Sequence, residues 1–444
     1  MGRFFGTDGV RGIANDDLSP ELAYKLGWAG ASFLVPGGSK GKIIVGRDTR
    51  ISGDLLESAL VTGICSAGVD VLKVGVIPTP GIAYLTRVLG ANAGVVISAS
   101  HNPAEYNGIK FFDSTGFKLS GETEDKIEEL MSGKDRRRPT GAGVGNIFEV
   151  PDAVERYVNH VVSTIAGDLE GFTVALDCAN GSACTVSPLV LRQLGAEVLV
   201  FAANPDGVNI NKECGSTYPQ YVQEIVRSHR VDLGLAHDGD ADRVIAVDED
   251  GEIVDGDFAM AICATHLKRE GKLPQNAVVT TVMTNMGFDI AMKRHGIDVV
   301  KTPVGDRYVL EEMLTRDIVI GGEQSGHIIF LEHNTTGDGI ITALQLMRVM
   351  RDTARKLSEL KKIMSRLPQV LLNVPVKDRG QLELATEIWK EVRAAEEELK
   401  DRGRVLVRPS GTEPLVRVMV ESDSEEEANS IARRIAGIIK KKLA

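Results

Sequence analysis

A repeated order of strands and helices most limits what this chain of 444 residues can fold into. Each copy has an apolar strand, a helix ending at glycine, a second strand that starts G-x-[DE]-V, and a third strand that ends in polar residues. The copies occupy residues 42–103, 172–243 and 277–327. Because they recur at domain-sized intervals, the pattern predicts related domains and not a solenoid.

The third strand of each copy ends in a different polar motif. These motifs are SASHNP at residues 98–103, DGDADR at residues 238–243 and GEQSGH at residues 322–327. Alternating strands and helices predict a largely parallel sheet covered on both faces, and ligands bind such sheets at the carboxyl ends of the strands. If the three domains face one cleft, we expect the three motifs to meet.

The chain is too long for a single hydrophobic core, which indicates several domains. Charged residues, Pro and Gly interrupt the pattern over residues 131–150, which is typical of a linker. A long helix is predicted from Ile340 to about Arg366, and the remaining sequence predicts strand, helix, strand, strand and helix. We therefore predict three related α/β domains with mixed, largely parallel sheets and a smaller C-terminal α+β domain, over residues 1–150, 151–252, 253–366 and 367–444.

Charge and hydropathy argue against two classes of partner. The formal net charge is −11, and the basic runs at residues 136–138 and 440–442 are short, so we expect no nucleic-acid partner. No apolar stretch is long enough to cross a bilayer, and the first residues lack an apolar signal segment, so we expect a cytoplasmic protein without a membrane partner. The five cysteines are scattered without metal-ligand spacing, which predicts reduced thiols.

Three carboxylates, those of Asp238, Asp240 and Asp242, alternate along a loop that contains Gly. This spacing lets hard oxygen ligands converge on one divalent cation. An EF-hand loop also begins D-x-D-x-D and would place Glu249 at its twelfth position, but its sixth position needs Gly and is Arg243 here. A solvated acidic turn is the other structural alternative. Beside a metal and a phosphate, Arg243 could clamp a phosphoryl oxygen.

Ser100 stands where the apolar run of residues 95–97 stops. A strand that ends in Ser-His-Asn-Pro can hold a hydroxyl rigidly at the edge of a sheet, where loops of α/β folds usually carry chemistry. The alternative is an ordinary strand followed by an Asn-Pro turn.

A phosphate-binding loop is predicted in the sequence RPSGTEP, which follows an apolar strand. Backbone amides around Gly411, the hydroxyls of Ser410 and Thr412 and the guanidinium of Arg408 form a plausible nest for an oxyanion. Arg417 on the next strand could add a second fork. A hairpin turn with surface arginines remains the alternative, and the absence of a nucleotide-binding glycine motif disfavours nucleotides.

The motif GEQSGH offers groups that suit sugar hydroxyls. Glu323 is an acceptor, Ser325 is both donor and acceptor, and His327 titrates near neutral pH. A Glu-Ser pair in a loop is more often plain surface, so this motif does not indicate a function unaided.

Five of these segments together resemble the signature loops of one family, the α-D-phosphohexomutases. They are FGTDGVRG at residues 5–12, ISASHNPAEYNGIKFF at 97–112, AHDGDADR at 236–243, GGEQSGH at 321–327 and RPSGTEPLVRVM at 408–419. The match follows the family's order over essentially the whole chain. One departure is Ala241, where the family commonly has Gly, so the structure tests whether this position needs a positive φ.

The resemblance implies four domains around a central cleft and a role for each motif. Ser100 would be the phosphoserine, and Asp238, Asp240 and Asp242 would bind Mg²⁺ together with its phosphate. The remaining residues would surround proton and phosphoryl transfer (Arg11, His101, Lys110, His327), hold the sugar (Glu323, Ser325), or bind phosphate (Arg243, Arg408, Ser410, Gly411, Thr412, Arg417).

The implied activity is an intramolecular phosphotransfer between glucosamine 6-phosphate and glucosamine 1-phosphate through a 1,6-bisphosphate. FGTDGVRG, together with Gln324 where the phosphomannomutase/phosphoglucomutase branch usually has Met, resembles the branch that acts on hexosamine phosphates more than the branch for neutral hexose phosphates. A metal-dependent phosphatase and a non-catalytic sugar-phosphate sensor are the rivals. The three-carboxylate loop argues against a sensor, since recognition alone needs no metal beside a hydroxyl. The oligomeric state stays open, with a homodimer as one candidate.

Overall fold

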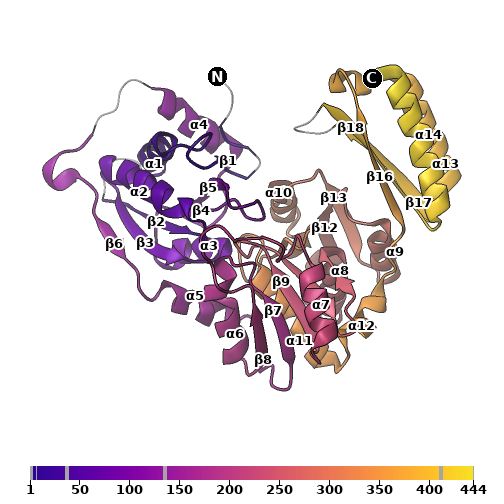
Figure 1. Ribbon diagram of the computed structural model, residues 1–444, viewed down its shortest axis with the longest axis horizontal. Coiled ribbons are helices and arrows are strands. Elements are labelled where there is room, and N and C mark those ends of the chain that lie inside the picture. Colours follow the sequence, from indigo (N-terminus) through magenta and orange to yellow (C-terminus); the bar gives the residue numbers. More distant parts are fainter. Residues whose placement is uncertain (1–3, 7, 36–39, 134–137, 410–413, 444) are drawn as a thin grey trace. The chain divides into compact units, whose positions relative to one another are not determined.

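The computed structural model describes residues 4–6, 8–35, 40–133, 138–409 and 414–443 (Figure 1). The chain forms two compact units, the first made of residues 1–283 and 297–362 and the second of residues 284–296 and 363–444. In the described part of the chain, no helix is both long and apolar enough to cross a membrane.

The first sheet has six strands in the order β1-β5-β4-β2-β3-β6. Their bounds are Val10–Ile13 for β1, Lys42–Arg47 for β2, Asp70–Val76 for β3, Ala93–Ile97 for β4, Tyr106–Asp113 for β5 and Ile147–Glu149 for β6. The helices of this region are α1 (Pro20–Leu34), α2 (Ser52–Ser66), α3 (Thr79–Val88) and α4 (Gly121–Ser132).

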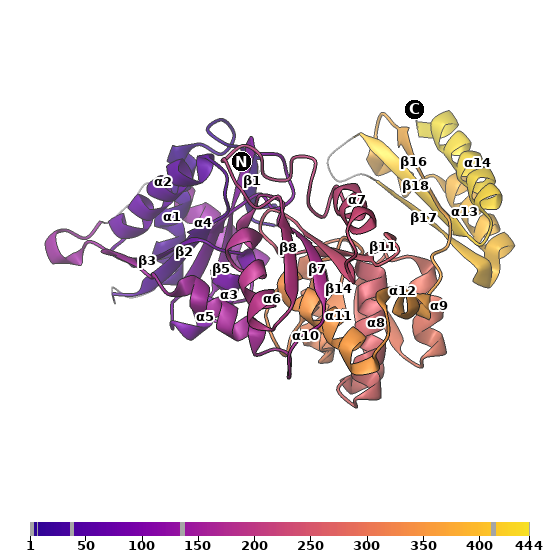
Figure 2. The same cartoon turned by 60° about the horizontal axis from the view of Figure 1, so that its bottom comes forward.

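Side chains along β2 and β4 point alternately to the two faces of this sheet, and helices pack on both faces. Ile43 and Val45 share one core with apolar residues of α1, α2 and α4. On the opposite face, a Cβ at Gly94 would lie 2.2 Å from Thr86 Oγ1 of α3, so only glycine allows α3 to pack this closely. Figure 2 gives a second view of these layers.

The second and third sheets repeat the same arrangement. The second has the order β11-β10-β9-β7-β8 and the third β13-β12-β14-β15. Their strands are Thr173–Asp177 (β7), Glu197–Phe201 (β8), Leu233–His237 (β9), Val244–Asp248 (β10), Ile253–Val254 (β11), Ala277–Thr281 (β12), Asp298–Thr302 (β13), Ile320–Gly322 (β14) and Ile328–Phe330 (β15). The helices are Ala153–Val162 (α5), Ser187–Gln193 (α6), Gln220–Ser228 (α7), Gly256–Arg269 (α8), Asp306–Arg316 (α10), Gly339–Thr353 (α11) and Leu357–Leu360 (α12).

The predicted repeat is confirmed by the strand pairing. In every copy the first strand pairs in parallel with the second and the third, and the third pairs antiparallel with the strand that follows it. The mixed, largely parallel sheets are therefore as predicted. The polar motifs follow the third strands β4, β9 and β14, which occupy equivalent places in the three sheets.

The second unit is the predicted α+β domain. Its strands β16 (Gln369–Pro375), β18 (Leu415–Ser422) and β17 (Gly403–Pro409) form an antiparallel sheet in that order. Helices α13 (Thr386–Leu399) and α14 (Glu425–Leu443) share its apolar core. Helix α9 (Met286–Arg294) belongs to this unit, because fully buried Glu421 accepts the N–H of Met286 at 2.8 Å and pairs with Arg404.

The single long helix predicted from Ile340 to about Arg366 is wrong. Helix α11 ends at Thr353, because Ala354 takes a left-handed conformation with φ 50° and its N–H donates to the Arg351 carbonyl. A short α12 and a 3₁₀ turn follow before β16. A left-handed residue commonly ends a helix, but it is usually glycine, so the sequence carries no clear stop signal here.

Asp338 ties the start of α11 to the preceding domain. Its Oδ1 accepts the N–H groups of Ile340 and Ile341 at 3.1 and 3.0 Å. Its Oδ2 accepts the Tyr157 hydroxyl at 2.6 Å and Asn334 Nδ2 at 3.1 Å. One buried carboxylate thus caps a helix and satisfies two side chains.

We predict that Asp338→Ala lowers the apparent midpoint of thermal unfolding by roughly 4–10 °C, because a helix cap and the partner of a buried hydroxyl are lost together. Asp338→Asn keeps an oxygen for the cap and should lose less. Thermal scans at one heating rate would measure both. An unchanged midpoint in Asp338→Ala would show that this junction contributes nothing to stability.

Candidate active site

The three polar motifs converge in the first unit. Ser100 Oγ at the end of β4 donates to Asp238 Oδ2 after β9 at 2.6 Å. His327 Nδ1, between β14 and β15, lies 3.4 Å from Asp242 Oδ2. All four side chains are buried. The motifs meet as expected, although the residues they contribute are far apart in the chain.

Ser100 has an unusual backbone for a serine. Its φ is 51°, in the left-handed region that L-residues rarely adopt. Its N–H donates to Ser98 Oγ at 2.9 Å, and its hydroxyl lies 3.3 Å from His101 Nδ1. Burial, followed by the charges of Arg243 and Arg11, lowers the pKa of His101 to about 4, so this imidazole is neutral at pH 7.

The three aspartates form a group of ligand-capable oxygens that all lie within 4.8 Å of one another. Burial, with the neighbouring Asp242 and Asp240, raises the pKa of Asp238 well above its ordinary value. Among the described residues, Asp240 Oδ1 and Asp242 Oδ1 find no hydrogen-bond partner although both atoms are buried. Buried oxygens without a donor are what a divalent cation would satisfy, so the donor set fits a metal.

The backbone of this loop answers the question raised by Ala241. Its φ is 55°, so the loop does need a positive φ at the position where the family commonly has Gly. Ala241 is fully buried, and its N–H donates to the Asp238 carbonyl at 3.1 Å. Alanine therefore carries a local strain here that glycine would not.

Lysines neutralise part of this buried negative charge. Lys110 Nζ lies 3.0 Å from Asp240 Oδ2 and 2.9 Å from Asp8 Oδ2. Although burial opposes its charge, Asp240 and Asp8 raise the pKa of Lys110 above its ordinary value. Lys118 pairs with Asp8 at 2.6 Å and also with Asp306. Asp306 in turn lies 3.6 Å from His327 Nε2, so the third motif adjoins this group of charges.

Asp8, Lys118 and Asp306 were not among the predicted site residues. Asp8 lies within FGTDGVRG and Asp306 within the third copy of the repeat, which were the available signals. Lys118 lies outside every motif, and only its contacts reveal it.

Two further residues that the sequence analysis missed bind groups of the three-aspartate loop. Thr79 at the start of α3 donates its hydroxyl to Asp240 Oδ2 at 2.7 Å and its N–H to the Asp240 carbonyl at 3.0 Å. His237 lies 3.1 Å through Nδ1 from the Arg243 carbonyl and 3.0 Å through Nε2 from Ser187 Oγ. Burial lowers the pKa of His237 to about 4, so it is neutral, with the proton on Nδ1.

The two predicted arginines of this unit flank the loop. Arg11 pairs with Asp8 at 2.7 Å and donates to Asn102 Oδ1 at 2.8 Å. Arg243 Nε lies 3.6 Å from Asp242 Oδ1, and although burial opposes its charge, Asp242 and Asp238 raise its pKa. The Arg243 guanidinium therefore stays charged beside the aspartates.

The third motif contributes polar atoms that can form further hydrogen bonds. Glu323 Oε1 accepts the N–H of Gly305 at 3.2 Å. Within the described chain, Ser325 Oγ is buried without a hydrogen-bond partner. Gly337 N–H donates to His327 Nε2 at 3.2 Å, which leaves the proton on Nδ1, facing Asp242.

The predicted phosphate loop lies in the second unit. Ser410, Gly411 and Thr412 are outside the described residues. Arg408 on β17 pairs in register with Arg417 on β18. Burial, and then the charge of Arg417, lower the pKa of Arg408. Two adjacent arginines of like charge would gain from an anion between them.

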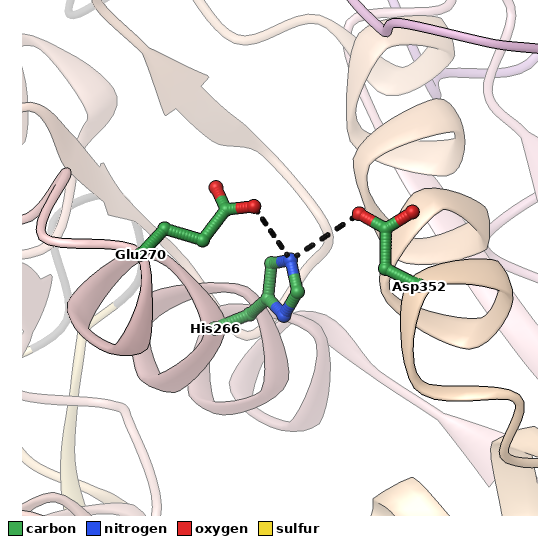
Figure 3. Close-up of side chains that lie close together, drawn as sticks. All are labelled: His266, Glu270 and Asp352. Carbon is green, nitrogen blue, oxygen red and sulfur yellow. Dashed lines mark ion pairs between the residues drawn. The ribbon is translucent and has the colours of Figure 1, made fainter.

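A second group of ligand-capable side chains lies away from these motifs (Figure 3). His266 Nε2 on α8 lies 3.4 Å from Glu270 Oε1 and 3.5 Å from Asp352 Oδ2 of α11. Arg348 pairs with both carboxylates, at 2.5 Å from Glu270 and 3.3 Å from Asp352, and Lys272 also pairs with Glu270. These cations already balance the carboxylates, so the group is an ion-pair cluster joining α8 to α11.

Family models cover nearly all of the chain. The four models of phosphoglucomutase/phosphomannomutase match here, the alpha/beta/alpha domains I, II and III over residues 2–138, 155–251 and 255–367 and the C-terminal domain over residues 371–438.

Named relatives are similar in sequence to this chain over almost their full lengths. A phosphoglucosamine mutase of Desulforamulus reducens is 57% identical over 441 residues, which cover 99% of both chains. One of Caldanaerobacter subterraneus is 54% identical over 446 residues, covering 100% of both.

Solved structures share the fold. A phosphoglucomutase/phosphomannomutase family protein of Burkholderia thailandensis aligns over 100% of this chain and 98% of its own, with TM-score 0.83 and 23% identity. The N-acetylphosphoglucosamine mutase of Aspergillus fumigatus, solved with GlcNAc-6P and magnesium, covers 99% of this chain and 96% of its own, with TM-score 0.72 and 19% identity. The chain therefore belongs to the phosphoglucomutase/phosphomannomutase family, the α-D-phosphohexomutases, which are isomerases.

Proposed function

We propose that this chain is a phosphoglucosamine mutase, which converts glucosamine 6-phosphate to glucosamine 1-phosphate through a phosphorylated Ser100 and a 1,6-bisphosphate. One observation carries the proposal: a buried serine hydroxyl lies 2.6 Å from a carboxylate of the three-aspartate loop. A hydroxyl beside a cation-binding loop is the arrangement that phosphoryl transfer requires. Relatives more than half identical over the whole chain carry that name.

The reaction is two phosphoryl transfers of opposite direction. In the first, the phosphorus–Oγ bond of phospho-Ser100 breaks while a bond forms to the free hydroxyl of the sugar phosphate, which loses its proton. In the second, the other phosphoryl group of the bisphosphate moves to Ser100 and its sugar oxygen regains a proton. The enzyme thus ends phosphorylated, and the phosphate has changed position on the sugar.

The charged residues around Ser100 suit this chemistry. Lys110, Arg11 and Arg243 are cations that would stabilise the charge that develops on the transferring group. His101, neutral and 3.3 Å from Ser100 Oγ, and His327, within the same site, are the candidates to hold or release the proton.

Asp238, Asp240 and Asp242 would hold Mg²⁺. An oxygen-only set favours this ion over softer metals, and two of the oxygens are buried without a hydrogen-bond partner among the described residues. When bound, the ion would neutralise charge on the phosphoryl oxygens.

The two remaining motifs would hold the substrate. Glu323 and the unpartnered hydroxyl of Ser325 suit sugar hydroxyls. Arg408, Arg417 and the loop of Ser410, Gly411 and Thr412 suit the phosphate that is not being transferred. We place the reaction in the cytoplasm, because such phosphorylated sugars do not cross membranes unaided.

Ser100→Ala tests the relay directly. It should lower kcat by roughly 10³-fold or more, since no other hydroxyl stands beside Asp238 Oδ2 in the described site. Intact mass should show a phosphoryl group on the wild type that phosphatase removes and Ser100→Ala lacks. An active Ser100→Ala variant would refute the relay.

Removal of the metal should abolish transfer, and added Mg²⁺ should restore it. Asp240→Asn should weaken Mg²⁺ binding by roughly 10- to 100-fold, because a ligand charge is lost. Asp250→Asn, an exposed change of the same kind in the same domain, is the matched control. Full activity of Asp240→Asn in excess chelator would contradict a metal requirement.

The choice of substrate is tested by kcat/KM for glucosamine 6-phosphate, glucose 1-phosphate and mannose 1-phosphate under one set of conditions. We expect the hexosamine phosphate to be preferred. The other two sugars should still react, but more slowly, because the ring hydroxyls that all three share would contact the same side chains. A clear preference for a neutral hexose phosphate would leave the mutase chemistry intact and assign the chain to the other branch.

A further inference from the structure

The guanidinium of Arg50 is fully buried and uses all five of its N–H donors. Its Nε donates to Asp48 Oδ2 at 2.9 Å. Its four other hydrogens go to the backbone carbonyls of a single short segment, Ser100, Asn102, Pro103 and Tyr106. Only arginine offers five donors in a fixed plane, so a lysine could not replace this set.

Asn211 reaches the same carbonyls from the second domain. Its Nδ2 donates to the Ser100 carbonyl at 2.9 Å and to the Asn102 carbonyl at 3.1 Å. Asn211 lies between β8 and α7, has φ 58°, and donates its own N–H to the Ala179 carbonyl at 2.9 Å. The carbonyl of the nucleophile thus receives one donor from each of two domains.

The Ser100 backbone needs such support. A serine with φ 51° is less stable than one in the β region, so the free loop would relax. The three-aspartate loop packs directly against the Ser100 carbonyl, so closely that a Cβ at Gly239 would lie 2.6 Å from this oxygen. A relaxed Ser100 backbone would therefore move its hydroxyl away from Asp238.

We propose that Arg50 and Asn211 are positioning residues for phosphoryl transfer, which clamp the Ser100 carbonyl from two domains and hold its hydroxyl at the three-aspartate loop. The inference rests on the proposed function. Ser100 has to donate and accept a phosphoryl group in every cycle, and a fixed backbone keeps its oxygen in line for both steps. Neither residue touches the reacting atoms, so neither is catalytic.

Asn211→Asp tests the clamp with almost no change of shape. It replaces the amide donor by an oxygen that faces two carbonyl oxygens, so the Ser100 backbone should shift. We expect kcat to fall roughly 10- to 100-fold while KM changes little. Phosphorylation of Ser100 by glucose 1,6-bisphosphate, followed by intact mass, should slow by a similar factor.

Asn209→Asp is the matched control. Asn209 lies in the same loop, and its Nδ2 donates to the Asn204 carbonyl and not to the carbonyls of residues 100–106. The same charge change there should leave kcat and the phosphorylation rate within about twofold of wild type. Asn211→Gly removes both donors without adding charge and tolerates the positive φ, so it serves if Asn211→Asp does not fold.

The outcomes separate the inference from the function. An inactive wild type that carries no phosphoserine would refute the proposed function itself. An active wild type with an unaffected, folded Asn211→Asp would overturn the clamp alone. A rise in KM at constant kcat in Asn211→Asp would also overturn the clamp, because it would indicate an effect on substrate binding. An equal loss of kcat in Asn209→Asp would overturn it too, because the added charge in the loop would then explain both losses.

Discussion

Three carboxylates buried side by side are the constraint on which the rest of the first unit depends. In a low-dielectric environment, like charges this close destabilise one another, and burial together with Asp242 and Asp240 raises the pKa of Asp238. Lys110, with Asp240 at 3.0 Å, and Arg243 supply opposite charge, and the two oxygens that lack a hydrogen-bond partner among the described residues are suited to a cation. The site is therefore stable only when these negative charges are offset by nearby positive charges.

That balance is supplied across domain boundaries. Lys110 and Thr79 come from the first domain but bind Asp240 of the second. Lys118 of the first domain pairs with Asp306 of the third. Because Lys110, Thr79 and His327 reach the aspartate loop from other domains, the site is complete only when the domains dock.

The three copies share a scaffold and differ where chemistry is expected. In each copy, a side chain at the end of the first strand or directly after it accepts the N–H two residues later, at Asp48, Asp177 and Thr281. The donor residue is Arg50 in the first copy, but Ala179 and Met283 in the others. Only the first copy thus has an arginine at this place, and this arginine donates to the Ser100 carbonyl, which illustrates how strand ends differ on a common fold.

The sequence by itself determined the repeat, the fold class and the motifs, because alternating apolar strands and amphipathic helices are local patterns. It also predicted that the motifs would meet. It could not predict the partners of those motifs, such as Lys118 with Asp306, since these contacts depend on how separate domains dock. It also missed the left-handed Ser100 and the helix end at Ala354. Non-glycine residues rarely adopt that conformation, and no local pattern in this sequence marks where they do, so the tertiary structure decided these features.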